Sequence, residues 1–582
     1  MLWPTTLALL ALLGPALAAQ EPPRCKAIPN APSWPPDTAW AALSNAVSGR
    51  LLKPPPPAAP CHQGPSYNAQ RCSAVRNGWG TADWHIAHPT SVMWQNWANY
   101  SCPLEGQRCD GTGYPVYVVA AKTAEDVSAA VRFAGAMNVR MNIKSTGHDF
   151  LGRSIQPNSL SIYTQGLKGI RWFDTSFSPK GCARPINGPA VTVGAGSLWS
   201  EIYASARAKG NVNVVGGYRG SVSVGGYIGN GGHGELSAKY GMAADMVLEI
   251  DLVTPSGEII TANECQNQDY FWAMRGGGAS TYGVALTFTL QAVRSGPTAK
   301  YTGFVGGWNE LAALHRQWTK FAAVGAGGYI NGYPARGTGR LSVSVYLGNA
   351  TSAALRSIVA PVMANLRTLD RGLGNGTEED GEWVEPASVG RYTDHDTYED
   401  AMGAPNDVEA INAESPGTGQ NKLLASWLWG PTELSSPKLV NALRGAFDAD
   451  TEIMTDAVFG VGTANPPFIR GGGNAVNPAF RTSVLRPASE IHWSGTDARE
   501  LEKRRAQQAR FGASLRSLSP AGGTYASEAD PDTPGWQTAF WGANYERLFA
   551  IKQKVDPRGV LYCRACVGSE LWTDVNGVLC RK

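Results

Sequence analysis

The chain has 582 residues, which exceeds one ordinary domain, so we expect two domains or one large two-part fold. Its 50 basic and 47 acidic residues leave a formal charge of +3 without a basic cluster, which argues against a nucleic-acid partner. Beyond the N-terminus no apolar run is long enough to span a bilayer, so no membrane partner is expected.

The N-terminus has the pattern of a secretory signal over residues 1–19. The apolar run Leu7–Leu13 precedes the small-x-small pattern Ala16-Leu17-Ala18, although no Lys or Arg precedes the run. Ten cysteines and the glycosylation sequons at Asn99, Asn349 and Asn375 agree with export. We therefore expect a secreted, extracellular glycoprotein.

The cysteine spacing favours disulfides over metal ligation. Cys102 and Cys109 span a short loop and are expected to pair with each other. Cys563-x-x-Cys566 together with Cys580 allows a zinc site as an alternative, but no suitable fourth ligand stands nearby. We expect no metal, and the remaining pairings stay open.

Residues 20–110 form a cysteine- and proline-rich extension, which we expect to wrap a surface rather than form its own sheet. A first α/β unit then begins with a strand at residues 114–120. A helix is predicted from Thr123 to Met137, with Thr123 as its N-cap and acidic residues in its first turn. A strand over residues 139–143 leads into the polar loop 142–154.

That loop places His148 after Gly147, in a sequence too polar for the core. A histidine in a glycine-rich turn is by itself more often a plain turn residue. The downstream sequence changes this interpretation, because it predicts a second α/β unit around a dense glycine run. Its predicted elements are a strand at 190–196, a helix at 198–209, a strand at 246–254, a short helix that breaks into a glycine loop over 268–278, and a strand at 283–290.

The glycine signatures stop after about residue 297. Residues 297–534 mix helices, at 310–322 and 351–367, with alternating strands such as 341–347, and we expect them to form a domain that covers the substrate. The segment 535–582 contains an amphipathic helix over residues 540–552.

The glycine run at 214–234 allows two interpretations. Gly229-x-Gly231-x-x-Gly234 matches a dinucleotide-binding fingerprint, but it follows a glycine- and serine-rich stretch and precedes a short helix ending near Tyr240. Alternatively, residues without a Cβ let backbone N–H groups approach a diphosphate directly. We favour the diphosphate cradle.

Four ordered blocks resemble the flavin-binding domain of the vanillyl-alcohol-oxidase (VAO) family, in its berberine-bridge-enzyme-like branch. The resemblance is strong over residues 113–295, moderate over the last 50 residues and weak over 297–520. It implies an α+β fold, in which a PCMH-type FAD-binding domain of two α/β subdomains joins an α+β substrate domain with an antiparallel sheet. The ending, with Cys563, Cys566 and Trp572, resembles fungal isoamyl-alcohol-oxidase-like members. The blocks are the His148 loop, Gly216-Gly217-Tyr-Arg219-Gly-Ser-Val222-Ser-Val-Gly225-Gly226 with Gly231-Gly232-His-Gly234, Tyr240-Gly-Met-Ala-Ala-Asp245, and Asp269-Tyr-Phe-Trp-Ala-Met-Arg-Gly276-Gly277-Gly278.

The resemblance implies FAD bound covalently through His148 to its 8α-methyl group. Arg219 stands where many relatives carry a second flavin-linked cysteine, so a single histidyl tether is expected, and Arg219 either lies near the flavin or is a plain surface residue. The small Val222 matches the position that controls oxygen access. The expected cofactor-binding residues are Lys144, Ser145, Thr146, Gly147, His148, Asp149, Ser154, Arg219, Val222, Gly225, Gly226, Gly231, Gly232, Gly234, Asp245 and Asn544.

Alcohol oxidation also needs a base beside the hydroxyl. Sugar-oxidising relatives have a tyrosine base in a Tyr-x-Asn-Tyr motif, where this chain has Tyr525-Ala-Ser-Glu528. A desolvated Glu528 carboxylate is therefore our candidate base, against the alternative of a solvated turn residue. Tyr525 and His492 are further candidates.

The expected function is a secreted FAD-dependent oxidase that converts a sugar, aromatic or secondary-metabolite alcohol to a carbonyl and reduces O2 to H2O2. Its partners are the alcohol and O2, and a monomer is expected. The alternatives are a flavin dehydrogenase or oxidative cyclase of a biosynthetic pathway, and a non-catalytic, glycan-binding secreted protein.

Overall fold

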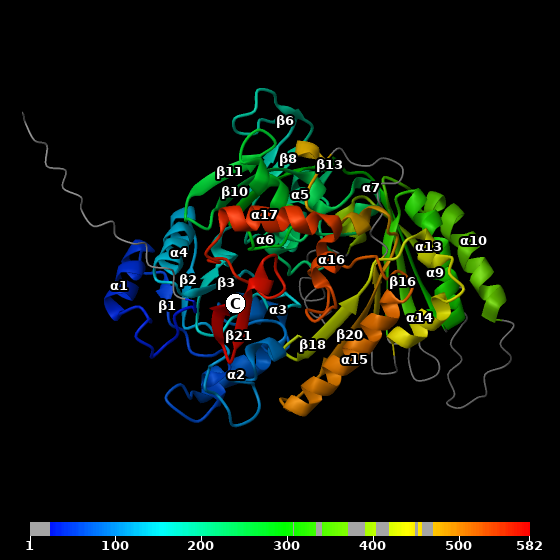
Figure 1. Cartoon of the computed structure of the whole chain (residues 1–582). Coiled ribbons are helices and arrows are strands. Elements are labelled where there is room, and N and C mark those ends of the chain that lie inside the picture. Colours follow the sequence, from blue (N-terminus) through cyan, green and yellow to red (C-terminus); the bar gives the residue numbers. More distant parts are fainter. Residues whose placement is uncertain are drawn as a thin grey trace, which may run out of the picture.

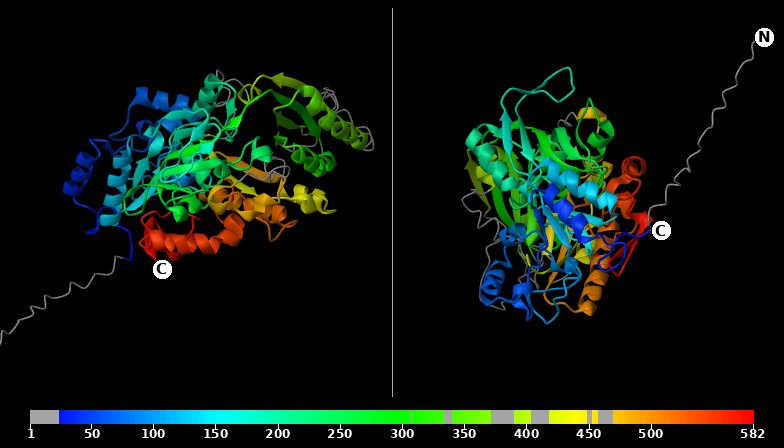
Figure 2. Two further views of the ribbon diagram at one scale, coloured as in Figure 1. Left: turned by 90° about the horizontal axis from the view of Figure 1, so that it is seen from above. Right: turned by 90° about the vertical axis from the view of Figure 1, so that its left-hand side faces the viewer.

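The computed structural model describes residues 24–306, 308–332, 340–370, 390–402, 418–447, 452–456 and 469–582 (Figure 1). The predicted signal segment 1–19 and the sequon at Asn375 lie outside these residues. The described chain places two smaller sheets on one side and a seven-stranded sheet on the other (Figures 1 and 2). The expected α+β class is confirmed.

The first sheet has the order β1-β2-β4-β3 and is parallel between β2, β4 and β3. Helix α4 (Ala124–Ala136) connects β2 to β3, as predicted, and the Thr123 hydroxyl accepts a hydrogen bond from the Asp126 amide in a capping box. Asp126 also pairs with Arg50, which ties the N-terminal extension to this unit. The strands are β1 (Leu51–Leu52), β2 (Tyr117–Ala120), β3 (Arg140–Lys144) and β4 (Ser159–Tyr163).

The second sheet is antiparallel and has the order β11-β10-β12-β8-β5. Helix α5 (Trp199–Lys209) buries Trp199 and Ile202 in the same hydrophobic core as Val191 and Val193 of β8. The predicted strands and helix are confirmed to within a few residues. The strands are β5 (Ile170–Phe173), β8 (Ala190–Gly194), β10 (Val247–Val253), β11 (Ile259–Asn263) and β12 (Val284–Gln291).

The glycine run 214–234 contains the six-residue helix α6 (Val224–Gly229) and leads to the four-residue helix α7 (Ser237–Tyr240). A dinucleotide-binding loop opens a long helix, so the helix after this run is too short for that alternative. The predicted short helix that breaks into a glycine loop over 268–278 is confirmed, because α8 (Gln268–Ala273) ends before the glycines.

The seven-stranded antiparallel sheet has the order β17-β14-β16-β15-β19-β20-β18. In β16 the side chains of Leu341, Val343 and Val345 are buried, whereas Ser342 and Ser344 between them are exposed or half-buried, which is the period of a strand with one face on a core. Helices α9, α10, α14 and α15 pack together beside this sheet (Figure 1). The strands are β14 (Thr298–Gly306), β15 (Gly327–Gly332), β16 (Arg340–Gly348), β17 (Arg391–His395), β18 (Asn421–Ser426), β19 (Glu452–Asp456) and β20 (Arg486–Trp493), and the helices are α9 (Trp308–Ala323), α10 (Ser352–Asp370), α14 (Leu439–Ala446) and α15 (Ala498–Arg516).

Over its described residues 24–110, the N-terminal extension contributes the two-residue strand β1 and three α-helices, which are α1 (Asp37–Ala46), α2 (Ala69–Gly78) and α3 (Ala82–Ala87). Trp40 of α1 stacks on Tyr117 of β2 with a ring separation of 4.0 Å. The extension therefore lies against the first sheet, as expected of a wrapping segment.

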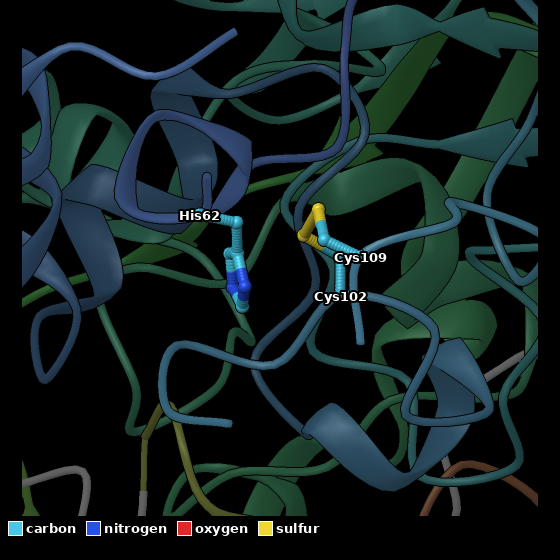
Figure 3. A group of neighbouring side chains, drawn as sticks. All are labelled: His62, Cys102 and Cys109. Atoms are coloured by element: carbon cyan, nitrogen blue, oxygen red, sulfur yellow. A yellow bond between two sulfur atoms is a disulfide. The ribbon is translucent and has the colours of Figure 1, made fainter. Parts of the chain in front are cut away.

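All ten cysteines form disulfides, and the predicted Cys102–Cys109 pair is confirmed. The zinc alternative is wrong, because Cys563 pairs with Cys566, and Cys580 pairs with Cys25. His62 lies beside the Cys102–Cys109 bridge (Figure 3), but sulfurs bonded to each other are not thiolate ligands. The other pairs are Cys61–Cys72 and Cys182–Cys265.

The C-terminal helix is interrupted, contrary to the predicted continuous helix over 540–552. α16 (Trp536–Trp541) ends at Gly542, whose φ of +53° is left-handed, and α17 (Tyr545–Val555) follows after a short turn. α17 lies beside the second sheet (Figure 1). There the Tyr282 hydroxyl donates to the Leu548 carbonyl. Within the described residues, no helix combines the length and apolar character needed to cross a membrane.

Candidate active site

One cavity collects side chains from both smaller sheets, the N-terminal extension and the seven-stranded sheet. Its lining includes many of the predicted residues. These are Ser145, Thr146, Gly147, His148, Asp149, Ser154, Arg219, Val222, Gly225, Gly226, Tyr525 and Glu528. The sequence thus predicted three segments, far apart along the chain, that meet at one site.

His148 lies in a loop that its neighbours hold in place. Gly147 has a φ of +90°, and its amide carbonyl accepts a hydrogen bond from Met93. The Asp149 carboxylate accepts hydrogen bonds from the backbone of Leu151 and from Arg153. Asp149 therefore fixes the shape of the loop that presents the imidazole.

The His148 imidazole is neutral. Its Nε2 lies 2.9 Å from the Ser221 hydroxyl oxygen. Burial, together with the positive charges of Arg219 and Lys422, lowers the pKa of His148 to about 3. A neutral ring keeps a nitrogen lone pair that can form a covalent bond.

Lys144 does not line the cavity. Its ammonium donates to the carbonyls of His85 and His88, 3.0 and 2.8 Å away, at the C-terminal end of α3. Burial lowers the pKa of Lys144 to about 7. Lys144 thus attaches the N-terminal extension, which carries Trp94 into the cavity wall.

The glycines divide into two groups with different surroundings. Gly225 and Gly226 line the cavity, and a Cβ on Gly226 would meet no atom within 4 Å, so the backbone there is open to a ligand. Gly231, Gly232 and Gly234 do not line it. They surround His233, whose side chain does.

Two further predicted residues also lie behind the cavity wall. Asp245 accepts hydrogen bonds from Arg481 at 2.6 and 2.7 Å and from Asn474 at 2.6 Å, so it joins the start of β10 to the loop at residues 470–481. Asn544 donates to the Val476 carbonyl of the same loop at 2.9 Å. Both residues position the segments around the site rather than facing it.

Arg219 and Val222 lie on the cavity wall, beside Tyr218. The Arg219 guanidinium lies 5.8 Å from the Tyr218 ring, and Tyr218 in turn contacts Tyr329 of β15 with a ring separation of 5.2 Å. Arg219 is half-buried at this position, unlike a plain surface residue.

Glu528 is not a solvated turn residue. Arg486 of β20, whose side chain is 0% exposed, forms an ion pair with its carboxylate and also approaches its carbonyl. Burial raises the pKa of Glu528, but the Arg486 charge outweighs this effect and lowers the pKa to about 2. The sequence suggested a desolvated carboxylate that acts as a base. The structure instead makes Glu528 a stable anion, which is a weak proton acceptor.

Tyr525 lies in the same wall and is buried. Burial and the nearby Glu528 charge raise the pKa of Tyr525 far above its usual value. Its phenol therefore stays protonated and can donate a hydrogen bond rather than act as a base.

A second ion pair, Lys422 with Glu490, joins β18 to β20 in the cavity wall. The Lys422 ammonium lies over the rings of Trp94 and Phe150, at 4.6 and 5.0 Å. Burial raises the pKa of Glu490, but the Lys422 charge lowers it below its usual range. His492 contacts Glu490 at 3.4 Å, behind this wall and outside the cavity lining.

The sequence analysis did not select several cavity residues, His233 among them. A usable signal existed for His233, because Gly232 precedes it and Gly234 follows it, as Gly147 precedes His148. The aromatic residues and the Lys422–Glu490 pair come from segments without any local signature. The unselected residues include Trp94, Phe150, Arg153, Tyr218, Tyr227, His233, Tyr329, Asn331, Lys422, Glu490 and Ser527.

Several known proteins are similar to this one over most of its length. Residues 115–263 match a family model for an FAD-binding domain, and residues 524–567 match one for berberine and berberine-like proteins. The VAO-type flavoprotein oxidase VAO615 of Thermothelomyces thermophilus is 32% identical over 98% of each chain. The chain belongs to the VAO/berberine-bridge-enzyme family of FAD-linked oxidoreductases.

One solved structure and one further relative show how far this similarity extends. The crystal structure of the VAO-type flavoprotein MtVAO615 from Myceliophthora thermophila superposes with a TM-score of 0.83 at 30% identity, covering 96% of this chain and 100% of that one. The bifunctional decalin synthase calF of Penicillium decumbens is 31% identical over 98% of each chain.

The cavity fits the FAD of this family. Gly147 and Gly225 have backbone atoms within 3.0 to 3.2 Å of where a Cβ would stand, so side chains are excluded from the close turns that face the cavity. Gly226 leaves its backbone open. The glycine-lined wall would hold the diphosphate, and the His148 loop would hold the flavin ring.

Proposed function

We propose that this FAD-linked oxidoreductase is a secreted oxidase that converts an alcohol to a carbonyl compound and passes the electrons to O2, forming H2O2. One observation carries the proposal. His148 lines the same cavity as three polar side chains, those of Tyr525, Glu528 and His233. Alcohol oxidation requires these two components, a cofactor site and polar groups for the hydroxyl, to be adjacent.

Bound FAD would supply the oxidising chemistry, by accepting a hydride from the carbon that carries the hydroxyl. The Tyr525 phenol, which stays protonated, donates a hydrogen bond to the substrate oxygen. The Glu528 anion favours positive charge in its vicinity. Trp94, Phe150, Tyr218 and Tyr329 give the cavity an aromatic wall that suits an aromatic or other amphipathic alcohol.

Oxygen as the acceptor is supported by two observations. VAO615, a relative over the whole chain, is named a flavoprotein oxidase. Val222, a small side chain, lies in the cavity wall at the position that the family resemblance relates to oxygen access.

We expect flavin reduced under argon by an alcohol to regain its yellow colour within seconds of mixing with air, with one H2O2 formed per turnover. The measurement is stopped-flow absorbance of the holoprotein, using a panel of benzylic alcohols, allylic alcohols and free sugars. Reduced flavin that persists for minutes in air would contradict the oxidase and favour a dehydrogenase.

A second candidate is an oxidative cyclase, which the relationship to the decalin synthase calF supports. Such an enzyme would reduce its flavin with a biosynthetic intermediate and not with the simple alcohols of the panel. A non-catalytic, glycan-binding role would gain support if no compound of either kind reduced the flavin.

We further propose that His148 forms the single covalent bond to FAD. Its Nε2 is held by Ser221, which leaves Nδ1 for the bond, and Arg219 supplies no thiol for a second one. In acid-denatured wild type, flavin fluorescence should stay with the polypeptide, whereas in His148→Ala it should pass entirely into the supernatant.

His395→Ala is the matched control, because His395 lies on β17 outside the cavity lining and should leave the fluorescence with the chain. Retained fluorescence in His148→Ala would show that another residue carries the bond. Free flavin in the denatured wild type would exclude covalent attachment.

Export and glycosylation form part of the same proposal, with O2 and the alcohol as partners and a monomeric chain. The Asn99 and Asn349 side chains are exposed, so an oligosaccharide has access to both. A loss of mass after enzymatic deglycosylation of the secreted protein is the check, and sedimentation of the holoprotein tests the monomer.

A further inference from the structure

The Cys563-x-x-Cys566 motif forms a disulfide at the wall of the cavity. Cys563 belongs to the cavity lining, whereas Cys566 lies outside the lining and is only 2% exposed. None of the other disulfides of the described chain contributes a residue to this lining. One sulfur of the motif therefore borders the site that would hold FAD, and the other is protected from solvent.

This disulfide adds little to the stability of the fold. Its cysteines have a sequence separation of 3, against 555 for Cys25–Cys580, and the entropic contribution of a disulfide grows with the length of the loop that it closes. Packing already anchors the segment, because Leu561 before the motif and Val567 after it are each 1% exposed. A structural role does not account for a disulfide at this position, which favours a chemical role.

Buried contacts fix the Cys563 sulfur at the cavity. The Thr281 hydroxyl oxygen lies 3.9 Å from Sγ. The Lys552 ammonium donates to the carbonyls of Thr281 and Leu561 at 2.7 and 2.8 Å, so it joins the loop that carries this hydroxyl to the loop that carries the sulfur. When the disulfide opens, the hydroxyl can donate a hydrogen bond to a thiolate, which is the reactive form of cysteine.

We propose that the Cys563–Cys566 disulfide is a second redox centre, which exchanges an electron pair with FAD in the cavity. The S–S bond breaks as reduced FAD gives up two electrons and one proton, a second proton comes from water, and two thiols form. In the reverse direction the dithiol is oxidised to the disulfide and FAD is reduced. This activity goes beyond the proposed alcohol oxidation, since it requires bound FAD and no alcohol.

The test is an anaerobic titration of the purified holoprotein with dithionite, which replaces the alcohol as the electron donor. Wild type should take up about four electrons per flavin, because the flavin and the disulfide each accept a pair. Cys563→Ser/Cys566→Ser should take up about two electrons per flavin, because only the flavin remains. Cys102→Ser/Cys109→Ser is the matched control. It removes another disulfide of short sequence separation, outside the cavity lining, and should still take up about four.

Alkylation identifies the reduced cysteines in wild type, without any variant. The titrated protein is denatured under argon in iodoacetamide, and its peptides are analysed by mass spectrometry. Cys563 and Cys566 should carry the label, whereas Cys265 should not, although Cys265 is exposed at the surface. A label on Cys265 would show that dithionite reduces disulfides directly, and the extra electrons would then be no support for exchange with FAD.

Two results overturn the inference and leave the proposed alcohol oxidation standing. One is wild type that takes up about two electrons per flavin, with no label on Cys563 or Cys566. The other is an uptake of about four electrons that persists in Cys563→Ser/Cys566→Ser. Conversely, uptake of about four electrons with the label on both cysteines, in a protein whose flavin no alcohol reduces, would refute the proposed function and support the redox role of the disulfide.

Discussion

Replacing Arg486 with methionine is expected to destabilise the protein by about 3–5 kcal/mol, which is typical when one partner of a buried ion pair is removed. Arg486 is fully buried, and both the carboxylate and the carbonyl of Glu528 depend on it. Methionine preserves much of the volume but leaves the anion without its counter-charge. Thermal unfolding of the holoprotein at pH 7 measures the loss.

The loss should depend on pH in a defined direction. Arg486 depresses the pKa of Glu528 to about 2 in the folded state, from an ordinary value of 4.5. The stabilisation is therefore complete above pH 4.5 and disappears as the pH falls toward 2. The gap between wild type and Arg486→Met should accordingly narrow over this window.

Two further variants separate the ion pair from packing. Arg486→Met/Glu528→Gln should recover most of the loss, because no unpaired charge remains. Arg356→Met changes an exposed arginine that lies over the Tyr392 ring of β17 and should cost less than about 1 kcal/mol. An equal loss in the single and double variants at Arg486 would assign the effect to packing instead.

Gly234→Ala is expected to be as severe. The added Cβ would overlap the Gly216 carbonyl oxygen. Gly216 itself lies against the buried Trp199 ring, so moving either backbone segment apart would cost packing energy. We expect a loss of at least about 3 kcal/mol and no measurable alcohol oxidation, because the turn that holds His233 is displaced.

Gly80→Ala is the matched control. Gly80 has nothing within 4 Å of its added Cβ and lies between α2 and α3, so this variant should unfold at the wild-type temperature. Normal stability and activity of Gly234→Ala would mean that the turn around His233 tolerates a side chain, and that the glycines there are not needed to place the imidazole.

The elements with strong periodicity could be predicted from the sequence. The helix beginning after Thr123 and the strand at Ala190 have local patterns and caps that agree with their final positions, so tertiary contacts had little to change. The loop that carries His148 was predicted for a similar reason, because the residues that define it are consecutive in the sequence.

The chemistry of Glu528 could not be predicted, since its pKa is set by Arg486 on a strand that the sequence does not connect to it. The different surroundings of the glycines could not be predicted either. Gly226 and Gly234 look alike in the sequence, yet one opens onto the cavity and the other lies against the Gly216 carbonyl. The break at Gly542 likewise depends on a left-handed backbone that helical periodicity does not reveal.

The Cys25–Cys580 disulfide joins the two ends of the described chain, and the Lys26 amide donates to the Leu579 carbonyl beside it. The bridge closes a covalent ring that includes every residue lining the cavity. A pulling force applied to residues 24 and 582 would therefore act on the disulfide, and the segments around the cavity would not be unfolded by it. Circular permutation of residues 25–580, with new ends in an exposed loop, should be tolerated, because Cys25 and Cys580 already lie together.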